Sequence, residues 1–180
     1  MLSENYTIPE HIHRFGVWTA ARAASTSRLK NSEVDQLFSM VRLKDSVNDL
    51  RNQTISDTEY MKWFKNICDK IIKAIPKINC GDFKEGRFSF GLAAKLVSIY
   101  IKTVEVIPTN GTSNLSRVAY PPIDNFLLKN IKKYHAINLP LNWSTFTWDT
   151  YKKWINELSE IKKDEPWWKL EEYWEINRGH

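Results

Sequence analysis

The chain has 180 residues, of which 42% are hydrophobic, and its 26 Lys and Arg residues outnumber its 21 Asp and Glu residues to give a net charge of +5. This length and composition exclude an intrinsically disordered chain and predict one globular domain with a proper core. The mild excess of positive charge suits an anionic partner such as nucleic acid.

The two cysteines, Cys68 and Cys80, form neither a Cys-x-x-Cys pair nor a cluster with histidines. The sequence therefore predicts no disulfide framework and no metal site. The first residues contain no apolar run behind a basic start, and no stretch is apolar enough to span a bilayer, so we expect neither a signal peptide nor a membrane helix. A reducing cytoplasm is the location that this pattern favours.

The first predicted helix covers about residues 9–25. Pro9 suits its first turn, and the apolar positions that follow repeat with the period of a helix. They are Ile12, Phe15, Val17, Trp18, Ala21 and Ala24. A central helix of the core is the plainer interpretation. The functional interpretation places Phe15 and Trp18 in the wall of a base-binding pocket.

Two further helices are predicted over about residues 33–44 and 57–74, each opened by a polar capping sequence. Beside the aromatic stripe of the second helix runs a row of lysines: Lys62, Lys65, Lys70, Lys73 and Lys77. Such a row can follow a phosphate backbone, although a solvated helix face is the plainer explanation. We take Lys62, Lys65 and Lys73, with Arg87 in the next loop, as candidate DNA contacts.

The helix predicted from about residue 90 to residue 104 has a broad apolar face. Gly91 and the two alanines after Leu92 leave room at its first turn for another backbone, either of protein or of DNA, so Gly91 is also a candidate DNA contact. Lys95 follows on a polar face that it shares with Lys102 and Glu105. A solvated surface lysine is the plain interpretation of Lys95.

The sequence Pro121-Pro122-Ile123-Asp124 comes next, and it predicts an extended entry into another helix with Asp124 at or near the N-cap. A capping role alone would explain this aspartate. Taken together, the small-residue turn, Ala-Lys, apolar helix, loop and Pro-apolar-Asp resemble the helix-hairpin-helix superfamily of DNA glycosylases and base-excision lyases. The 8-oxoguanine branch of that superfamily is the most similar.

The resemblance implies a catalytic role for Lys95 as the nucleophile that attacks C1′ of a nucleotide turned out of the duplex, with Asp124, 29 positions later, as the supporting carboxylate. It implies DNA with a damaged or modified base as the partner, and no cofactor. The superfamily's Gly-apolar-Gly hairpin is absent, because only Gly86 and Gly91 stand before Lys95. The alternative is therefore a non-catalytic helical protein that binds nucleic acid or serves in an assembly.

Two more helices are predicted over about residues 149–161 and 167–176. Trp167 and Trp168 in the last one would pack onto the first helix, or else form a base-stacking wall. No strand pattern and no repeat appears, so we expect an all-α fold of about seven helices in a single domain, 1–180. The first and last helices are expected in one lobe, beside a groove that holds Lys95 and Asp124.

Overall fold

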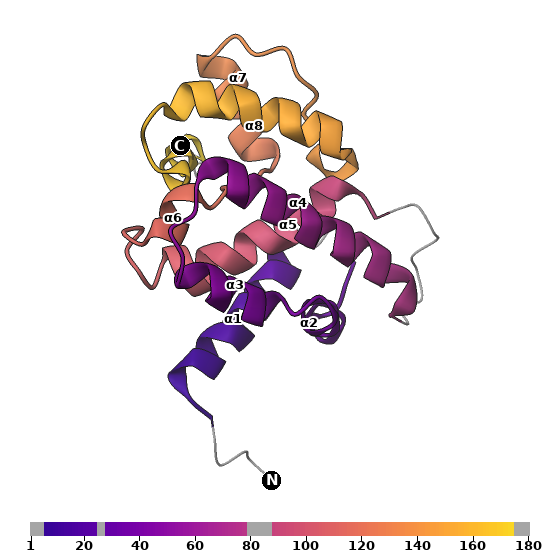
Figure 1. Cartoon of the computed structure of the whole chain (residues 1–180). Coiled ribbons are helices and arrows are strands. Elements are labelled where there is room, and N and C mark those ends of the chain that lie inside the picture. The colour runs from indigo at the N-terminus through magenta and orange to yellow at the C-terminus, as the bar shows by residue number, and fades with distance from the viewer. Residues whose placement is uncertain (1–5, 25–27, 79–87, 175–180) are drawn as a thin grey trace, which may run out of the picture.

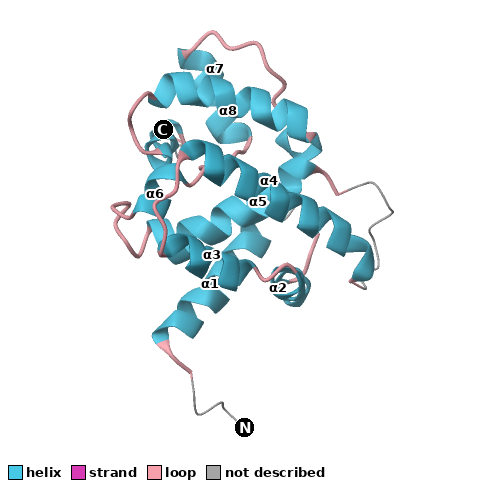
Figure 2. Cartoon of the chain, viewed as in Figure 1, coloured by secondary structure: helices cyan, strands magenta, loops and turns pink. Residues whose placement is uncertain are grey.

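The computed structural model describes residues 6–24, 28–78 and 88–174, and all the regular elements within these ranges are helical (Figures 1 and 2). The α-helices are α1 Ile8–Ala23, α2 Asn31–Met40, α3 Leu43–Arg51, α4 Asp57–Ala74, α5 Phe90–Ile101, α6 Asn114–Val118, α7 Asn125–Tyr134 and α8 Trp148–Lys162. The 3-10 segments are η2 Ile75–Lys77, η4 Trp143–Thr145 and η5 Trp167–Tyr173, and the segment η3 Lys102–Val106 is π-helical. The predicted all-α class is confirmed for the described residues, although the helices are divided differently.

Local capping chemistry places most helix starts where the sequence predicts them. The Thr7 hydroxyl accepts from the backbone N–H of Glu10 ahead of α1. Ser56 and Glu59 form a reciprocal capping box at the start of α4, in which the Ser56 backbone N–H donates to Glu59 Oε2 at 2.9 Å. Asp124 is the N-cap of α7, as its position after two prolines predicts. These starts depend on residues close in sequence, so the sequence alone is enough to find them.

The helix expected over residues 33–44 is wrong in extent, because the chain turns at its end and begins α3. Arg42 adopts a left-handed backbone conformation, with φ of 52°, between α2 and α3. Val41 and Leu43 on either side of it are buried. Neither glycine nor proline marks this turn in the sequence. The burial of its two apolar neighbours depends on the rest of the core, so the turn could not be predicted from the local residues alone.

Helix α5, which is predicted as a core helix, is the central helix of the molecule. It packs against α1, α4, α8 and η4. Figure 1 shows α5 in the middle, with α1, α2 and α3 towards the bottom of the view and α7 and α8 at the top. The solvated polar face predicted for α5 is wrong, because Lys95 and Ser98 on that face are buried along with the apolar residues.

Helix α1 lies close along α5 and η3, and Gly16 makes this approach possible. A Cβ atom at position 16 would lie 2.7 Å from Val104 Cγ1 and 3.0 Å from Tyr100 Cδ2. The hydroxyl of Thr19 lies 3.0 Å from the hydroxyl of Thr103 on the same side. The inner face of α1 is therefore fixed in position by direct contact with the central helix.

The last predicted helix is present as the 3-10 segment η5, and its main contacts are with α6, α7 and α8. The expected packing of the last helix onto the first is therefore wrong. Pro166 precedes the segment, and Trp167 and Leu170 are its buried residues. Trp167 Nε1 donates to Asp57 Oδ1 at 2.8 Å, which ties η5 to the start of α4 instead.

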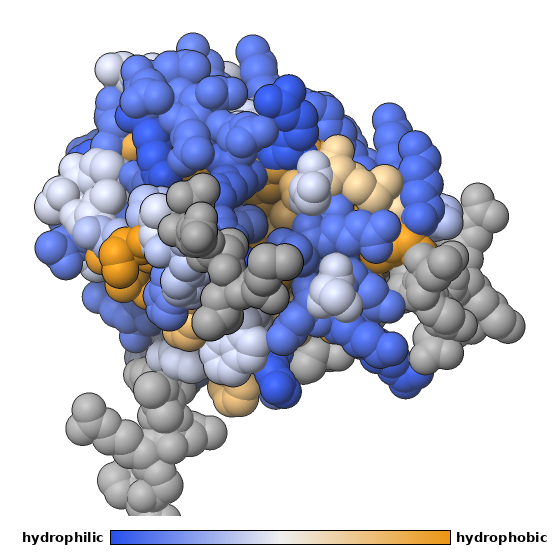
Figure 3. Space-filling view, turned by 90° about the horizontal axis from the view of Figure 1, so that it is seen from below, coloured by the Kyte–Doolittle hydropathy of each residue, from blue (hydrophilic) through white to orange (hydrophobic). Residues whose placement is uncertain are grey.

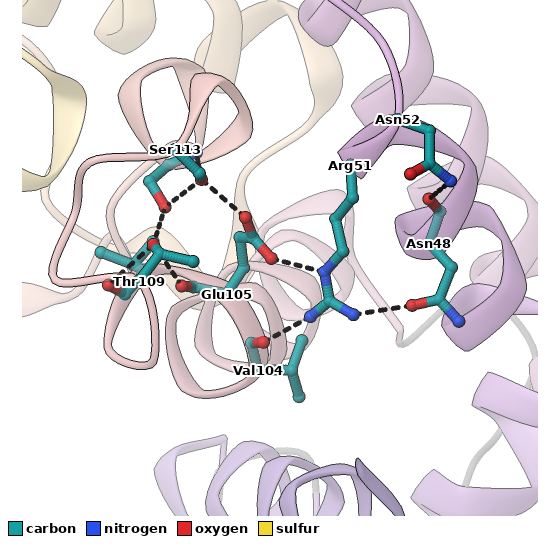
Figure 4. Close-up of polar contacts among 9 residues, drawn as sticks. Asn48, Arg51, Asn52, Val104, Glu105, Thr109 and Ser113 are labelled. Atoms are coloured by element: carbon teal, nitrogen blue, oxygen red, sulfur yellow. Dashed lines mark hydrogen bonds and ion pairs between the residues drawn. The ribbon is translucent and has the colours of Figure 1, made fainter.

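The π-helical segment η3 is held to α3 by a buried carboxylate, Glu105, whose relative exposure is 2% (Figure 4). Arg51 Nε donates to Glu105 Oε2 at 2.5 Å, and the Ser113 hydroxyl donates to Oε1 at 2.6 Å. The other two nitrogens of the guanidinium donate to the Val104 carbonyl and to the side-chain oxygen of Asn48. Both carboxylate oxygens are thus satisfied, so this network has a structural role.

Candidate functional site

Lys95 and Asp124 meet in the structure although they lie on different helices. Lys95 stands in the second turn of α5, whose N-cap is Ser89, and Asp124 is the N-cap of α7. Lys95 Nζ lies 3.1 Å from Asp124 Oδ2. The expectation that the two side chains lie together is confirmed. The interpretation of Lys95 as a solvated surface lysine is wrong, because its side chain is buried.

The Lys95 side chain is largely shielded from solvent. The side chain is 8% exposed, and Nζ lies 4.5 Å from the ring centroid of Trp143 in η4. Burial lowers the pKa of Lys95, while the charge and the hydrogen bond of Asp124 oppose that change. The net lowering of the pKa increases the fraction of neutral amine at a given pH, and the neutral amine is the nucleophilic form of lysine.

Asp124 is held in one orientation by four hydrogen-bond donors. Its Oδ1 accepts from the backbone N–H groups of Phe126 and Leu127, each at 3.0 Å. Its Oδ2 accepts from Lys95 and, at 3.2 Å, from Trp174 Nε1. The four donors thus fix the carboxylate in position at the start of α7.

A cavity of about 330 Å³ opens beside this pair. It is lined by Ala23, Lys95, Ile99, Lys102, Pro122, Asp124, Phe126, Leu127, Glu171 and Trp174. We call it the Lys95 cavity. Its second ion pair joins Lys102 of η3 to Glu171 of η5. Burial raises the pKa of Glu171, and the charge of Lys102 opposes this.

The rim of the Lys95 cavity carries two exposed aromatic rings. Phe126 is 55% exposed and Trp174 is 43% exposed, and their ring centroids lie 6.4 Å apart in an edge-to-face arrangement. Exposed aromatic rings beside a cavity can pack on a planar ligand. The cavity therefore combines an apolar entrance with two lysine–carboxylate pairs inside.

The candidate DNA contacts do not gather around this cavity. Gly91 is buried, and a Cβ there would lie 1.8 Å from the carbonyl oxygen of Trp143, so the backbone that approaches Gly91 belongs to the protein itself. Lys62 and Lys73 are exposed on α4, which does not line the cavity, and Lys65 is paired with Asp69 at 2.6 Å. Arg87 lies outside the described residues.

The four aromatic residues named for a base pocket also lie elsewhere. Phe15 and Trp18 are about half exposed on the outer face of α1. Trp167 is buried in the core, and Trp168 covers Gly111, with its Nε1 donating to the Gly111 carbonyl at 3.3 Å. None of the four lines the Lys95 cavity, so their assignment to its wall is wrong.

Five residues around Lys95 were not assigned to the site from the sequence. They are Lys102, Phe126, Trp143, Glu171 and Trp174. The helical spacing of seven residues between Lys95 and Lys102 was a usable signal, because it places both on one face. Phe126 lies only two residues after Asp124, whereas Trp143, Glu171 and Trp174 reach the site through packing between distant segments, which no local pattern reveals.

A second cavity, of about 440 Å³, lies on the other side of η3. Its polar wall includes Glu105 and Arg51, which are engaged with each other, and His13, whose Nδ1 lies 2.9 Å from the Tyr100 hydroxyl. Lys44, also in the wall, is paired with Glu10 at 2.9 Å. Each of these polar side chains is thus engaged with another side chain of the protein.

Searches with this chain matched no protein-family model, no curated protein and no solved structure. Within residues 6–24, 28–78 and 88–174, no helix is long and apolar enough to cross a membrane. The same ranges contain no group of three or more His, Cys, Asp or Glu side chains that could hold a metal ion.

Proposed function

We propose that the protein is a DNA base-excision enzyme, a glycosylase with associated lyase activity, in which Lys95 is the nucleophile and Asp124 the supporting carboxylate. The observation that carries this proposal is the 3.1 Å contact between Lys95 Nζ and Asp124 Oδ2 at the wall of a cavity. At about 330 Å³, the cavity is within the usual size of a small-molecule site and is large enough for one unstacked base.

In the reaction, the lone pair of Lys95 Nζ attacks C1′ of the extruded nucleotide. The bond between C1′ and the base breaks, and the base leaves with the bonding electrons and takes up one of the two protons of the attacking nitrogen. The nitrogen lone pair then forms the C1′=N bond as the C1′–O4′ bond breaks, and O4′ takes up the remaining nitrogen proton, which leaves an imine between Nζ and C1′ and an opened sugar. The burial that lowers the pKa of Lys95 supports the first step, since only the neutral amine carries the lone pair.

Asp124 would act by charge in this mechanism. Its carboxylate lies beside the amine, where positive charge develops on the nitrogen and on the sugar as the new bond forms. The four donors to its oxygens fix it before the substrate arrives, so no reorganisation is needed during the reaction. Phe126 and Trp174 would pack against the extruded base at the entrance.

Borohydride trapping tests this proposal, because borohydride reduces an imine to a stable amine. The protein would be incubated with oligonucleotides that carry an abasic site, an oxidised purine or another modified base, and adducts would be separated on denaturing gels. Wild type should form an adduct. Lys95→Gln should form none, since the amide keeps a hydrogen-bond donor near Asp124 but has no nucleophilic amine.

Lys102→Gln is the matched control, because Lys102 lines the same cavity and is the more exposed of the two lysines, at 34% against 8%. It should still form the adduct. If wild type forms no adduct with the whole panel, or if Lys95→Gln forms as much as wild type, the enzymatic proposal is wrong. The buried ion pair would then serve the alternative, a non-catalytic helical protein in which it joins α5 to α7.

A further inference from the structure

The outer face of α1 carries a line of aromatic rings. His11, Phe15, Trp18 and Arg22 are spaced four, three and four residues apart, so they lie on one side of the helix, and Tyr6 extends the line ahead of it. This side lies opposite the buried residues Gly16, Val17, Ala20 and Ala21, which face the core. Tyr6 and Phe15 are each 51% exposed, and Trp18 is 44% exposed. We call these five residues the α1 stripe.

The rings in the α1 stripe are ordered by contact with one another. Phe15 and Trp18 are stacked, with centroids 5.6 Å apart and planes 17° from parallel. Tyr6 and His11 form an edge-to-face pair at 5.8 Å, and the Tyr6 hydroxyl lies 2.6 Å from His11 Nδ1. The close packing of α1 on α5 through Gly16 holds the whole face in place.

Arginines accompany both pairs of rings. The Arg14 guanidinium lies 4.9 Å from the centroid of Tyr6, and that of Arg22 lies 5.7 Å from Trp18. Arg14 is paired with Glu10, whereas the ion pairs found among the described residues leave Arg22 without a carboxylate partner. The end of α1 is therefore both aromatic and cationic.

We propose that the α1 stripe binds single-stranded nucleic acid, with unpaired bases stacked on Phe15 and Trp18 and a phosphate contacted by Arg22. Exposed rings interleaved with arginines are the combination that such strands require, because every base has a flat face and every linkage carries a negative charge. From His11 to Arg22 the helix rises about 16 Å, enough for roughly four or five stacked nucleotides.

The position of α1 connects this surface with the Lys95 cavity. Ala23, one residue after Arg22, lines that cavity. A strand that lies along α1 would therefore reach the cavity entrance at the end of the helix.

The face seen from the end of the molecule where α1 and α2 lie is mostly hydrophilic, with apolar side chains in separate patches (Figure 3). The binding proposal does not depend on any reaction of Lys95.

The test measures binding of a fluorescein-labelled 12-nucleotide oligo(dT) by fluorescence anisotropy at low salt. Phe15→Ala combined with Trp18→Ala should raise the dissociation constant by roughly 100-fold, since loss of one stacked base contact of about 1.4 kcal/mol is tenfold. Trp18→Phe alone should keep most of the affinity, because the ring remains. Both side chains are about half exposed, so thermal unfolding followed by circular dichroism should be nearly unchanged.

Tyr134→Ala is the matched control. Tyr134 is also an exposed ring, 52% accessible, with the Lys133 ammonium 5.1 Å from its centroid, but it lies on α7. Its removal should change the dissociation constant less than twofold. The proposal is overturned if wild type does not bind the oligonucleotide, or if the double variant binds it as wild type does.

Sedimentation velocity without the oligonucleotide tests a different occupant, a second copy of the chain. A dimer that the double variant abolishes would identify the α1 stripe as a self-association surface and overturn the proposal. A chain that is monomeric and binds oligo(dT) supports it. Lys95→Gln should bind oligo(dT) like wild type, so a failure of the trapping experiment leaves this result standing on its own.

Discussion

Replacing Asp124 by asparagine separates the two functions of this side chain. Asparagine ranks with aspartate as an N-cap, so the amide oxygen can still accept from the backbone N–H groups of Phe126 and Leu127. The amide nitrogen, however, would face the two donors that Oδ2 now accepts from, Lys95 and Trp174. The variant therefore keeps the cap of α7 and removes the anion from beside a buried cation.

The size of the effect follows from the burial of the pair. Lys95 is 8% exposed and Asp124 is 14% exposed, and removing one partner of a buried pair costs about 3–5 kcal/mol of unfolding free energy. We expect the lower end, about 3 kcal/mol, because Lys95 can release its proton. In a Lys95→Met background no ammonium is left, so Asp124→Asn should cost about 1 kcal/mol, which gives a coupling of about 2 kcal/mol.

Urea unfolding of wild type, both single variants and the double variant measures this coupling. A coupling below about 0.5 kcal/mol would refute the reasoning, because two independent substitutions simply add.

The same proteins give a test of the pH dependence of stability. Burial lowers the pKa of Lys95 below its ordinary value of 10.5, so between the two values the unfolded chain binds more protons than the folded chain, and stability rises with pH. The unfolding free energy of wild type minus that of Lys95→Met should therefore increase from neutral pH towards 10.5. A difference that stays flat or falls over this range would contradict the lowered pKa of Lys95.

Other substitutions probe the close approach at Gly91 and the ion pairs of Glu105 and Glu10. Gly91→Ala should lower the unfolding free energy by about 2–3 kcal/mol in urea, because its Cβ would lie 1.8 Å from the Trp143 carbonyl oxygen; an unchanged midpoint would contradict the close approach. Glu105→Ala should cost about 2–3 kcal/mol in the same assay, since the donors to its carboxylate lose their acceptor. A hydrogen bond from Lys44 helps to lower the pKa of Glu10 from 4.5 to about 2, so its stabilisation is present above pH 4.5 and is lost as the pH falls to about 2. Glu10→Gln should reduce the loss of stability over that range, measured by thermal unfolding.

The sequence predicts those parts of the fold that depend on neighbouring residues. Pro9, Ser56 and Asp124 mark helix starts because a cap needs only the next three residues. The turn at Arg42 has no such signal, since its left-handed conformation is imposed by the burial of residues on both sides. The all-α class was therefore predictable, whereas the division into helices was only partly so.

The candidate site shows the same limit more sharply. The sequence identifies Lys95 and Asp124 but assigns Lys95 to a solvated face, because helical periodicity shows which residues share a side and not what covers that side. The cover is the η4 turn, where the Trp143 ring lies against the ammonium some 50 positions further along the chain. Trp174 reaches Asp124 from a comparable distance. Contacts of this kind are set by tertiary packing and leave no local pattern.

The π-helical segment η3 forms part of the wall of both cavities. Lys102 at its start lines the Lys95 cavity, while Val104 and Glu105 line the second cavity. Each end also carries an ion pair, to η5 through Glu171 and to α3 through Arg51. A ligand that binds in one cavity and displaces this segment would change the affinity of the other cavity for its own ligand. Because thermodynamic linkage is reciprocal, the second ligand would change the affinity for the first by the same factor. The partition between the cavities is thus a single π-helical turn that two binding equilibria would share.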